Sequence, residues 1–200
     1  MLDLKNIVFV TNRKLCDGDY LAQLDKVLSM HPDSLILREK DLDDAAYEEL
    51  AGKAMELCAV YEVPFYIHSH WEIAAKLGCR NIHLSIPALR ELAGIDAEEN
   101  ADGAHLHDDS GFERISVSCH SIEDVQEACR AGATRIVLGN IFETDCKKGL
   151  PGKGLNFLSE ICRISTVPVY GIGGIDLDRL PMLLEVGAAG GCMMSGLMRL

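Results

Sequence analysis

The sequence predicts an α/β protein whose parallel strands and crossover helices close into a (β/α)8 barrel. Short apolar or β-branched runs alternate with segments of helical periodicity through nearly all of the 200 residues. There are eight such runs, at nearly even spacing. Repeated strand–helix units give parallel strands with right-handed crossovers. Eight units are the number that a TIM barrel needs, and an open doubly wound sheet is the competing fold.

The expected strands are short and rich in Val, Ile, Leu and aromatic residues, as buried parallel strands are. They are IVFV (7–10), SLIL (34–37), VPFYI (63–67), NIHLS (81–85), RISVS (114–118), RIVLG (135–139), VPVYG (167–171) and GGCMMS (190–195).

The expected helices repeat apolar residues three and four positions apart, which gives each one buried face. They cover residues 21–30, 44–61, 70–78, 121–133, 155–165 and 176–188. Residues 94–111 are polar and acidic and are expected to form a surface loop in an irregular fourth unit. The chain ends at Leu200, so the final helix is a stub. Another segment or a second copy of the chain, in a homo-oligomer, would have to cover that flank.

Composition and charge indicate one globular domain over residues 1–200, with 48% hydrophobic and 25% charged residues. The net charge of −12 argues against nucleic acid as a partner, because phosphate backbones bind basic surfaces. No apolar run approaches the ~18 residues of a membrane span, and the N-terminus lacks signal-peptide features. The eight cysteines are scattered, which favours free thiols in a reducing compartment over a zinc site or disulfides. We therefore expect a cytoplasmic protein.

Polar or glycine-containing segments follow all eight expected strands. In such barrels the reacting groups come from the C-terminal ends of the strands and the loops after them. These positions are Thr11-Asn12, Arg38-Glu39-Lys40, His68-Ser69-His70, His83, Cys119-His120-Ser121, Gly139-Asn140, Gly171-Ile172-Gly173-Gly174 and Met194-Ser195-Gly196. Their convergence on one mouth predicts an active site.

Glycines after the seventh expected strand form the strongest single motif. Gly171, Gly173 and Gly174 would let backbone amides approach an anion, and Ser195 and Gly196 after the eighth strand could add more. The pattern predicts a phosphate site, with a tight turn that binds no ligand as the alternative. It lacks the spacing and the position of a dinucleotide fingerprint.

Two cations follow the second expected strand. Alternation places Arg38 and Lys40 on the same side, where both could face a second anionic group. Asn140 and the loop at 141–154 follow the sixth strand, and Thr144, Lys147 and Lys148 make this loop a candidate lid. A solvated charged loop is the alternative in both cases.

Histidines are the candidate acid–base groups. His120 directly follows the fifth strand, where it could both take and give a proton near neutral pH, although a structural histidine is the alternative. His68, His70 and His83 have spacing that could suggest a metal, but no carboxylate obviously completes the set. The His105-x-His107 run is expected to be a solvated loop.

These landmarks resemble the thiamin phosphate synthase/TenI superfamily along nearly the whole chain. The matching segments are 10–12, 37–40, 117–121, 139–154, 171–174 and 194–196. Residues 142–150 are especially similar to the TenI branch, the thiazole tautomerases. The resemblance implies a cytoplasmic TIM-barrel enzyme that binds a small phosphorylated thiazole.

Missing carboxylates favour the tautomerase branch. The synthases of the superfamily join a pyrimidine pyrophosphate to a thiazole phosphate and need magnesium to neutralise the departing pyrophosphate. They carry Asn-Asp after the third strand and Gln-x-Asp after the fourth, where this sequence has His68-Ser69 and Ile86-Pro87-Ala88. We therefore expect no metal and no other cofactor, and an isomerase that aromatises a carboxythiazole phosphate.

The resemblance assigns the proton transfer to His120 and the phosphate to Gly173, Gly174, Ser195 and Gly196. Arg38 and Lys40 would face the carboxylate or developing negative charge. Three alternatives remain: a synthase (a transferase) with rearranged metal ligands, a non-catalytic regulatory or ligand-binding barrel, and a phosphate-binding barrel isomerase of another pathway. Magnesium dependence would identify the first, and binding without turnover the second.

Overall fold

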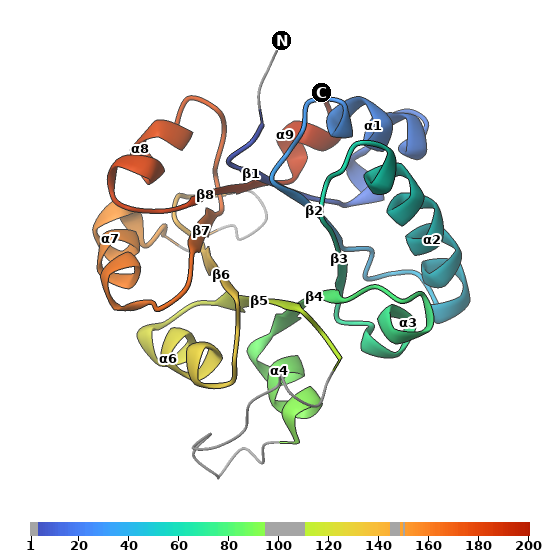
Figure 1. Ribbon diagram of the computed structural model, residues 1–200. Coiled ribbons are helices and arrows are strands. Elements are labelled where there is room, and N and C mark those ends of the chain that lie inside the picture. Colours follow the sequence, from blue (N-terminus) through green and yellow to red (C-terminus); the bar gives the residue numbers. More distant parts are fainter. Residues whose placement is uncertain (1–3, 95–110, 145–148, 150) are drawn as a thin grey trace.

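Eight parallel strands form a closed barrel, in which each strand pairs with its neighbours in sequence and β8 pairs with β1 (Figure 1). The computed structural model describes residues 4–94, 111–144, 149 and 151–200. The strands are β1 (Ile7–Val10), β2 (Ser34–Leu37), β3 (Phe65–His68), β4 (Asn81–Ser85), β5 (Arg114–Cys119), β6 (Arg135–Gly139), β7 (Val169–Ile172) and β8 (Gly190–Met193). The predicted barrel is confirmed, and the open sheet is excluded.

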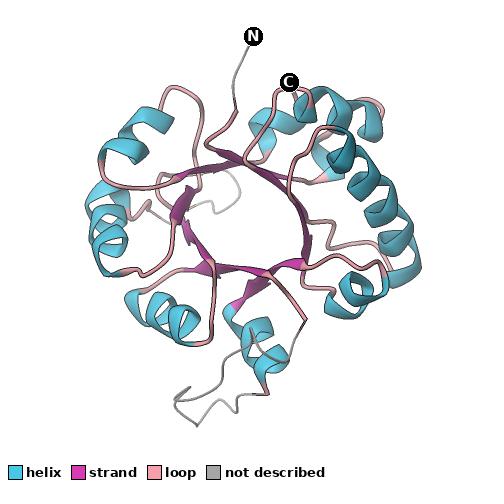
Figure 2. Cartoon of the chain, viewed as in Figure 1, coloured by secondary structure: helices cyan, strands magenta, loops and turns pink. Residues whose placement is uncertain are grey.

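Helices form an outer ring around the strands (Figure 2). They are α1 (Tyr20–Leu28), α2 (Asp44–Val60), α3 (Trp71–Lys76), α4 (Ile86–Ala93), α6 (Ile122–Arg130), α7 (Gly154–Ile164), α8 (Leu180–Glu185) and α9 (Ser195–Met198), with a 3-10 turn η1 at Arg13–Leu15. None of these helices is both long and apolar enough to cross a membrane, within the ranges that the structure describes.

The short final helix covers part of the flank that the sequence leaves open. Leu197 and Met198 of α9 are buried in the core. Gln23 and Lys26 of α1 donate hydrogen bonds to the carbonyls of Leu197 and Leu200. The end of the chain is thereby tied to α1, and cover for this flank comes at least partly from the same chain.

Apolar side chains pack on both faces of the strands, one face toward the helices and one toward the barrel interior, because successive side chains of a strand point to opposite sides. Ile7 and Phe9 of β1 pack against the helices. Val8 and Val10 belong to a smaller cluster inside the barrel, whose other buried members are Ile36, Tyr66, Val137, Tyr170 and Cys192. Full burial of one such side chain contributes about 1.5–3 kcal/mol. The seven cysteines in the described ranges are free thiols, and four are buried.

Candidate active site

A cavity of about 670 Å³ opens at the C-terminal ends of the strands, and we call it the mouth cavity. Every strand or the loop after it contributes to its wall, as the sequence predicts for a barrel mouth. The lining residues are Val10, Arg38, Lys40, His68, Ser69, His70, Ser85, Ser118, His120, Gly139, Asn140, Thr144, Ile172, Gly173, Gly174, Ile175, Cys192, Met194 and Ser195.

The turn after β7 requires glycine. Gly173 has φ +101° and Gly174 φ +63°, in the left-handed region that residues with a Cβ rarely adopt. A Cβ on Gly173 would lie 2.7 Å from the Cβ of Asn140, and one on Gly174 would lie 2.6 Å from the Glu143 carbonyl oxygen. The backbone after β7 therefore packs directly on the loop after β6, with no room for a side chain.

The other predicted phosphate residues divide into two groups. Ser195 lines the mouth cavity at the start of α9. Gly171 and Gly196 are not among the lining residues. A Cβ on Gly171 would lie 2.8 Å from Leu183 Cδ2, so this glycine packs against α8 and not against the cavity. The structure thus places Gly173, Gly174 and Ser195 at the site and leaves Gly171 in a packing role.

The loop after β6 brings Asn140 and Thr144 into the cavity wall. Its two ends are held together, because the Lys153 amide donates to the Asn140 carbonyl at 3.0 Å and the Gly154 amide to the Ile141 carbonyl at 2.9 Å. Lys147 and Lys148, also expected to face the ligand, lie outside the described residues.

Arg38 and Lys40 both line the cavity, beside the half-buried His68. Burial, followed by the positive charges of Arg38 and Lys40, lowers the pKa of His68 to about 4. His68 is therefore neutral at physiological pH, and the positive charge on this wall comes from the arginine and the lysine.

Glu39, between the two cations in sequence, does not face the mouth cavity. Its side chain is buried, and Oε1 accepts hydrogen bonds from Thr11 Oγ1 at 2.7 Å and from the Tyr20 hydroxyl at 3.0 Å. Its carboxylate also accepts from the Arg13 amide. Glu39 thus holds the loops after β1 and β2 together and faces away from the side that Arg38 and Lys40 share, as strand alternation predicts.

His120 lines the cavity just before α6. Its amide and that of Ser121 donate to Asp124 Oδ2, within the capping interactions that begin the helix. Its Nδ1 lies 2.8 Å from the Gly139 carbonyl oxygen. Because a carbonyl can only accept, Nδ1 carries the proton and Nε2 of the neutral ring is left as an acceptor.

The remaining histidines do not converge on a metal. His70 stacks on Tyr47 with ring centroids 4.0 Å apart, and His83 is 4% exposed inside the barrel below the mouth. In the described ranges no three His, Cys, Asp or Glu side chains are close enough to hold an ion. The expectation that His83 faces the mouth is therefore wrong. His105 and His107 lie outside the described residues.

The cavity wall does not fit a magnesium ion held by protein carboxylates. Mg²⁺ prefers oxygen ligands, chiefly carboxylates. The described lining residues include two cations, three histidines and five serine or threonine hydroxyls, namely Ser69, Ser85, Ser118, Thr144 and Ser195, but no Asp or Glu.

The sequence did not predict that Ser85 and Ser118 line the cavity, nor most of its apolar wall. Ser118 is two residues from the buried Ser116 in β5, so strand alternation could have placed both toward the barrel interior. The apolar lining residues are Val10, Ile172, Ile175, Cys192 and Met194. Ile172 and Met194 belong to segments that the sequence places at the mouth, whereas the other three were not assigned to it. Together they supply an apolar surface against which a ring can pack.

Comparison with known proteins gives one consistent family. A family model described as thiamine monophosphate synthase matches residues 7–197. The thiamine-phosphate synthase of Clostridium acetobutylicum is 29% identical over 98% of this chain and 90% of its own. That of Yersinia pseudotuberculosis is 30% identical over 90% and 79%. A thiamine phosphate pyrophosphorylase from Pyrococcus furiosus has a TM-score of 0.77 at 22% identity, covering 98% of this chain and 90% of that one, which supports the fold.

These relatives correct the functional expectation. The sequence-based hypothesis placed the chain in the tautomerase branch and made it an isomerase. The curated relatives that align with 90–98% of the chain are instead named thiamine-phosphate synthases, which are transferases. The absence of carboxylates after β3 and β4 therefore does not identify the tautomerase branch. With the family model covering residues 7–197, the chain belongs to the thiamine monophosphate synthase family.

Proposed function

We propose that this protein joins a thiazole phosphate to a pyrimidine that carries a pyrophosphate leaving group. The observation that carries the proposal is the similarity, along nearly the whole chain, to proteins named thiamine-phosphate synthase. The mouth cavity is consistent with it, since the cations after β2 and the glycines after β7 offer two separate places for anions.

The thiazole phosphate is assigned to the wall formed after β6, β7 and β8. Gly173 and Gly174 let the backbone approach an anion without side chains between them, and Ser195 adds a hydroxyl. Asn140 and Thr144 border the same wall. Binding of this kind depends on close backbone approach. Packing on the loop after β6, which leaves no room for a Cβ, holds Gly173 and Gly174 at this wall.

The pyrophosphate is assigned to Arg38 and Lys40, which line the cavity after β2. In the reaction a bond forms between the thiazole nitrogen and the pyrimidine's methylene carbon, and the carbon–oxygen bond to pyrophosphate breaks. The electron pair leaves with the pyrophosphate, so negative charge grows on its oxygens. A unit charge 4 Å from an opposite charge is stabilised by about 4 kcal/mol near a protein surface. Two cations can therefore stabilise the leaving group substantially.

His120 has a different role in this reaction than in a tautomerisation. The thiazole nitrogen that attacks carries no proton, so bond formation needs no general base. With Nδ1 bound to the Gly139 carbonyl, Nε2 can accept a hydrogen bond from a substrate donor. We assign His120 to substrate binding.

Magnesium, which this family of synthases is expected to use, has no carboxylate ligands in the described cavity wall. No step of the proposal depends on it, and charge neutralisation is assigned to Arg38 and Lys40. The absence of carboxylates from the described lining favours a second candidate function, a barrel that binds thiazole phosphate without turnover.

The purified protein, incubated with thiazole phosphate and hydroxymethylpyrimidine pyrophosphate, tests the proposal. Thiamine phosphate and pyrophosphate should form in equal amounts, and an Arg38→Met/Lys40→Met double variant should form far less. Saturable binding of thiazole phosphate with no product, with or without added magnesium, would support the binding barrel instead.

A further inference from the structure

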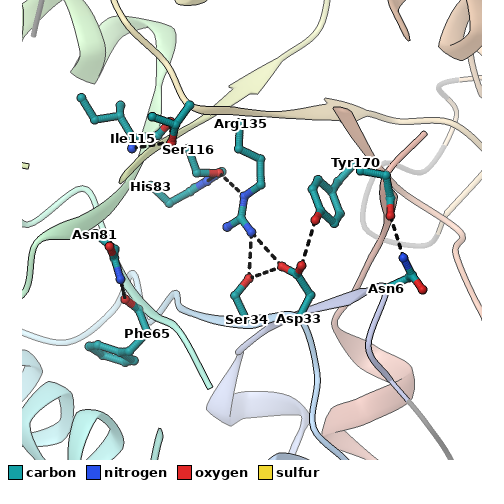
Figure 3. Close-up of polar contacts among 12 residues, drawn as sticks. Asn6, Asp33, Ser34, Phe65, Asn81, His83, Ile115, Ser116, Arg135 and Tyr170 are labelled. Atoms are coloured by element: carbon teal, nitrogen blue, oxygen red, sulfur yellow. Dashed lines mark hydrogen bonds and ion pairs between the residues drawn. The ribbon is translucent and has the colours of Figure 1, made fainter. Parts of the chain in front are cut away.

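A row of buried polar side chains crosses the barrel interior from its N-terminal end to the mouth cavity. The row consists of Arg135, Ser116, His83 and Ser118, and we call it the interior chain. Figure 3 shows Arg135 at one end, reaching across the barrel toward Asp33 and Ser34, and Ser116 between Arg135 and His83. Such polar groups are costly to bury without hydrogen bonds, and within this row only Arg135 Nη2 is buried without a partner.

Arg135 is fixed at the N-terminal end of the barrel, where it lines a second cavity with Asp33, Ser34 and two tyrosines. Its Nη1 donates to Asp33 Oδ2 at 3.1 Å and to Ser34 Oγ at 2.8 Å. The guanidinium carbon lies 4.3 Å from the ring centre of Tyr66 and 5.2 Å from that of Tyr170. The Tyr170 hydroxyl in turn donates to Asp33 Oδ1. These contacts hold the guanidinium in one orientation, with Nε directed at Ser116.

Arginine sets the direction of the hydrogen bonds. It has only donors, so Arg135 Nε donates to Ser116 Oγ over 3.2 Å. The other contact of Ser116 Oγ is His83 Nδ1 at 2.8 Å. The Ser116 hydroxyl therefore donates its own proton to His83 Nδ1, which makes Nδ1 the acceptor. The opposite direction would leave a buried hydroxyl proton without an acceptor.

His83 continues the same order of donors and acceptors toward the mouth cavity. With Nδ1 as acceptor, the neutral ring carries its proton on Nε2, which lies 2.8 Å from Ser118 Oγ. Ser118 then accepts from His83, and its own proton is free to point into the cavity that it lines. Burial, with smaller effects from His68, Arg135 and Arg38, lowers the pKa of His83, so the ring stays neutral.

We infer that Arg135, acting through Ser116 and His83, makes Ser118 a hydrogen-bond donor toward the ligand in the mouth cavity. Arg135 and His83 are positioning residues in this account, since neither lines the cavity. The matching ligand atom is an acceptor, such as a ring nitrogen or an anionic oxygen. The ligand part of this inference rests on the proposed function, whereas the direction of the interior chain does not.

The direction of the hydrogen bonds in the interior chain is tested by nitrogen-15 NMR of the His83 ring, which distinguishes a protonated from an unprotonated ring nitrogen. The wild-type protein should show one tautomer with the proton on Nε2. Arg135→Met removes the donor at similar length and should give a mixture of tautomers, whereas the exposed control Arg80→Met should not change the ring.

A wild-type ring protonated on Nδ1 overturns the inference. So does a ring that stays fully Nε2-protonated in both Arg135→Met and Ser116→Ala. Should Arg135→Met fail to fold, the wild-type spectrum and Ser116→Ala still decide the question.

The ligand part is tested by the affinity for inorganic pyrophosphate and for thiazole phosphate, measured by calorimetry. Ser118→Ala should weaken at least one of them about tenfold, the size of one lost hydrogen bond to a charged group. Unchanged affinity for both would refute the ligand part. An Nε2 tautomer in a protein that forms no thiamine phosphate would leave the interior chain intact and refute only the proposed function.

Discussion

The turn after β7 gives a prediction whose size can be worked out from the structure. Gly173→Ala adds one methyl group at φ +101°, and the new Cβ would lie 2.7 Å from Asn140 Cβ and 3.0 Å from Asn140 Cα. The left-handed backbone costs about 1–2 kcal/mol for a residue with a Cβ. Overpacking against backbone adds about 1–3 kcal/mol. We therefore expect Gly173→Ala to lower the free energy of unfolding by about 2–5 kcal/mol.

Gly187→Ala separates these two contributions. Gly187 has nearly the same φ, +97°, but its added Cβ would meet only Cys162 Cβ at 3.5 Å, an ordinary contact. This variant should therefore lose only the backbone contribution, about 1–2 kcal/mol. Urea unfolding of both variants measures the difference.

The same pair of variants tests the phosphate site. Relief of the Gly173 contact must displace either the turn or Asn140, so the KM for thiazole phosphate should rise at least about tenfold, which corresponds to ~1.4 kcal/mol of binding. Gly187→Ala should leave KM unchanged, because Gly187 lies at the end of α8, away from the cavity lining. Equal stability loss in the two variants, with normal KM in both, would refute the reasoning.

Three further predictions concern the cationic wall and the histidines. Arg38→Met and Lys40→Met should each weaken pyrophosphate binding at least about tenfold by calorimetry and reduce its salt dependence, with unchanged thiazole phosphate binding as the internal control. Because the pKa of His68 is lowered to about 4, the unfolded chain binds this proton first as pH falls, so the contribution of His68 to stability should be complete above about pH 6.5 and decline by about 3 kcal/mol toward pH 4. His68→Gln should remove that part of the decline in urea unfolding. His120→Asn should lower kcat for coupling less than about tenfold, whereas a loss of about 10²–10⁴ would indicate proton transfer by this residue.

The sequence predicts the strands well because both faces of a barrel strand are buried, so each strand is a nearly continuous apolar run. The starts of β3 and β7 are two residues later than expected. Each expected run began with Val-Pro, and proline has no N–H to donate to a strand ladder. The Pro64 and Pro168 carbonyls still accept from Leu35 and Ile136 just before the strands begin.

Helix α4 was missed, although its signals are present in the sequence. Pro87 lies in the first turn, where its missing N–H has no cost, and Ser85 Oγ accepts from the Ala88 amide as the N-cap. Gly94, with φ +63°, ends the helix. The helix has only eight residues and directly precedes the polar segment expected to be a loop, of which residues 95–110 lie outside the described part of the chain.

The candidate site was predictable where it depends on strand ends and glycine spacing. Arg38, Lys40, His120 and Gly173 lie around one cavity because they follow parallel strands of a closed barrel. The burial of Arg135 was not predictable. It depends on Asp33, 102 positions earlier, and on two tyrosines from β3 and β7, which come together only when the barrel closes.

The central claim is that this cavity couples two substrates. The most direct measurement is the appearance of thiamine phosphate and pyrophosphate when purified protein receives thiazole phosphate and hydroxymethylpyrimidine pyrophosphate, followed by chromatography with and without magnesium and chelator. The account predicts equal amounts of both products, formed catalytically and abolished by loss of Arg38 and Lys40. Tight binding of thiazole phosphate with no product under any of these conditions would contradict it.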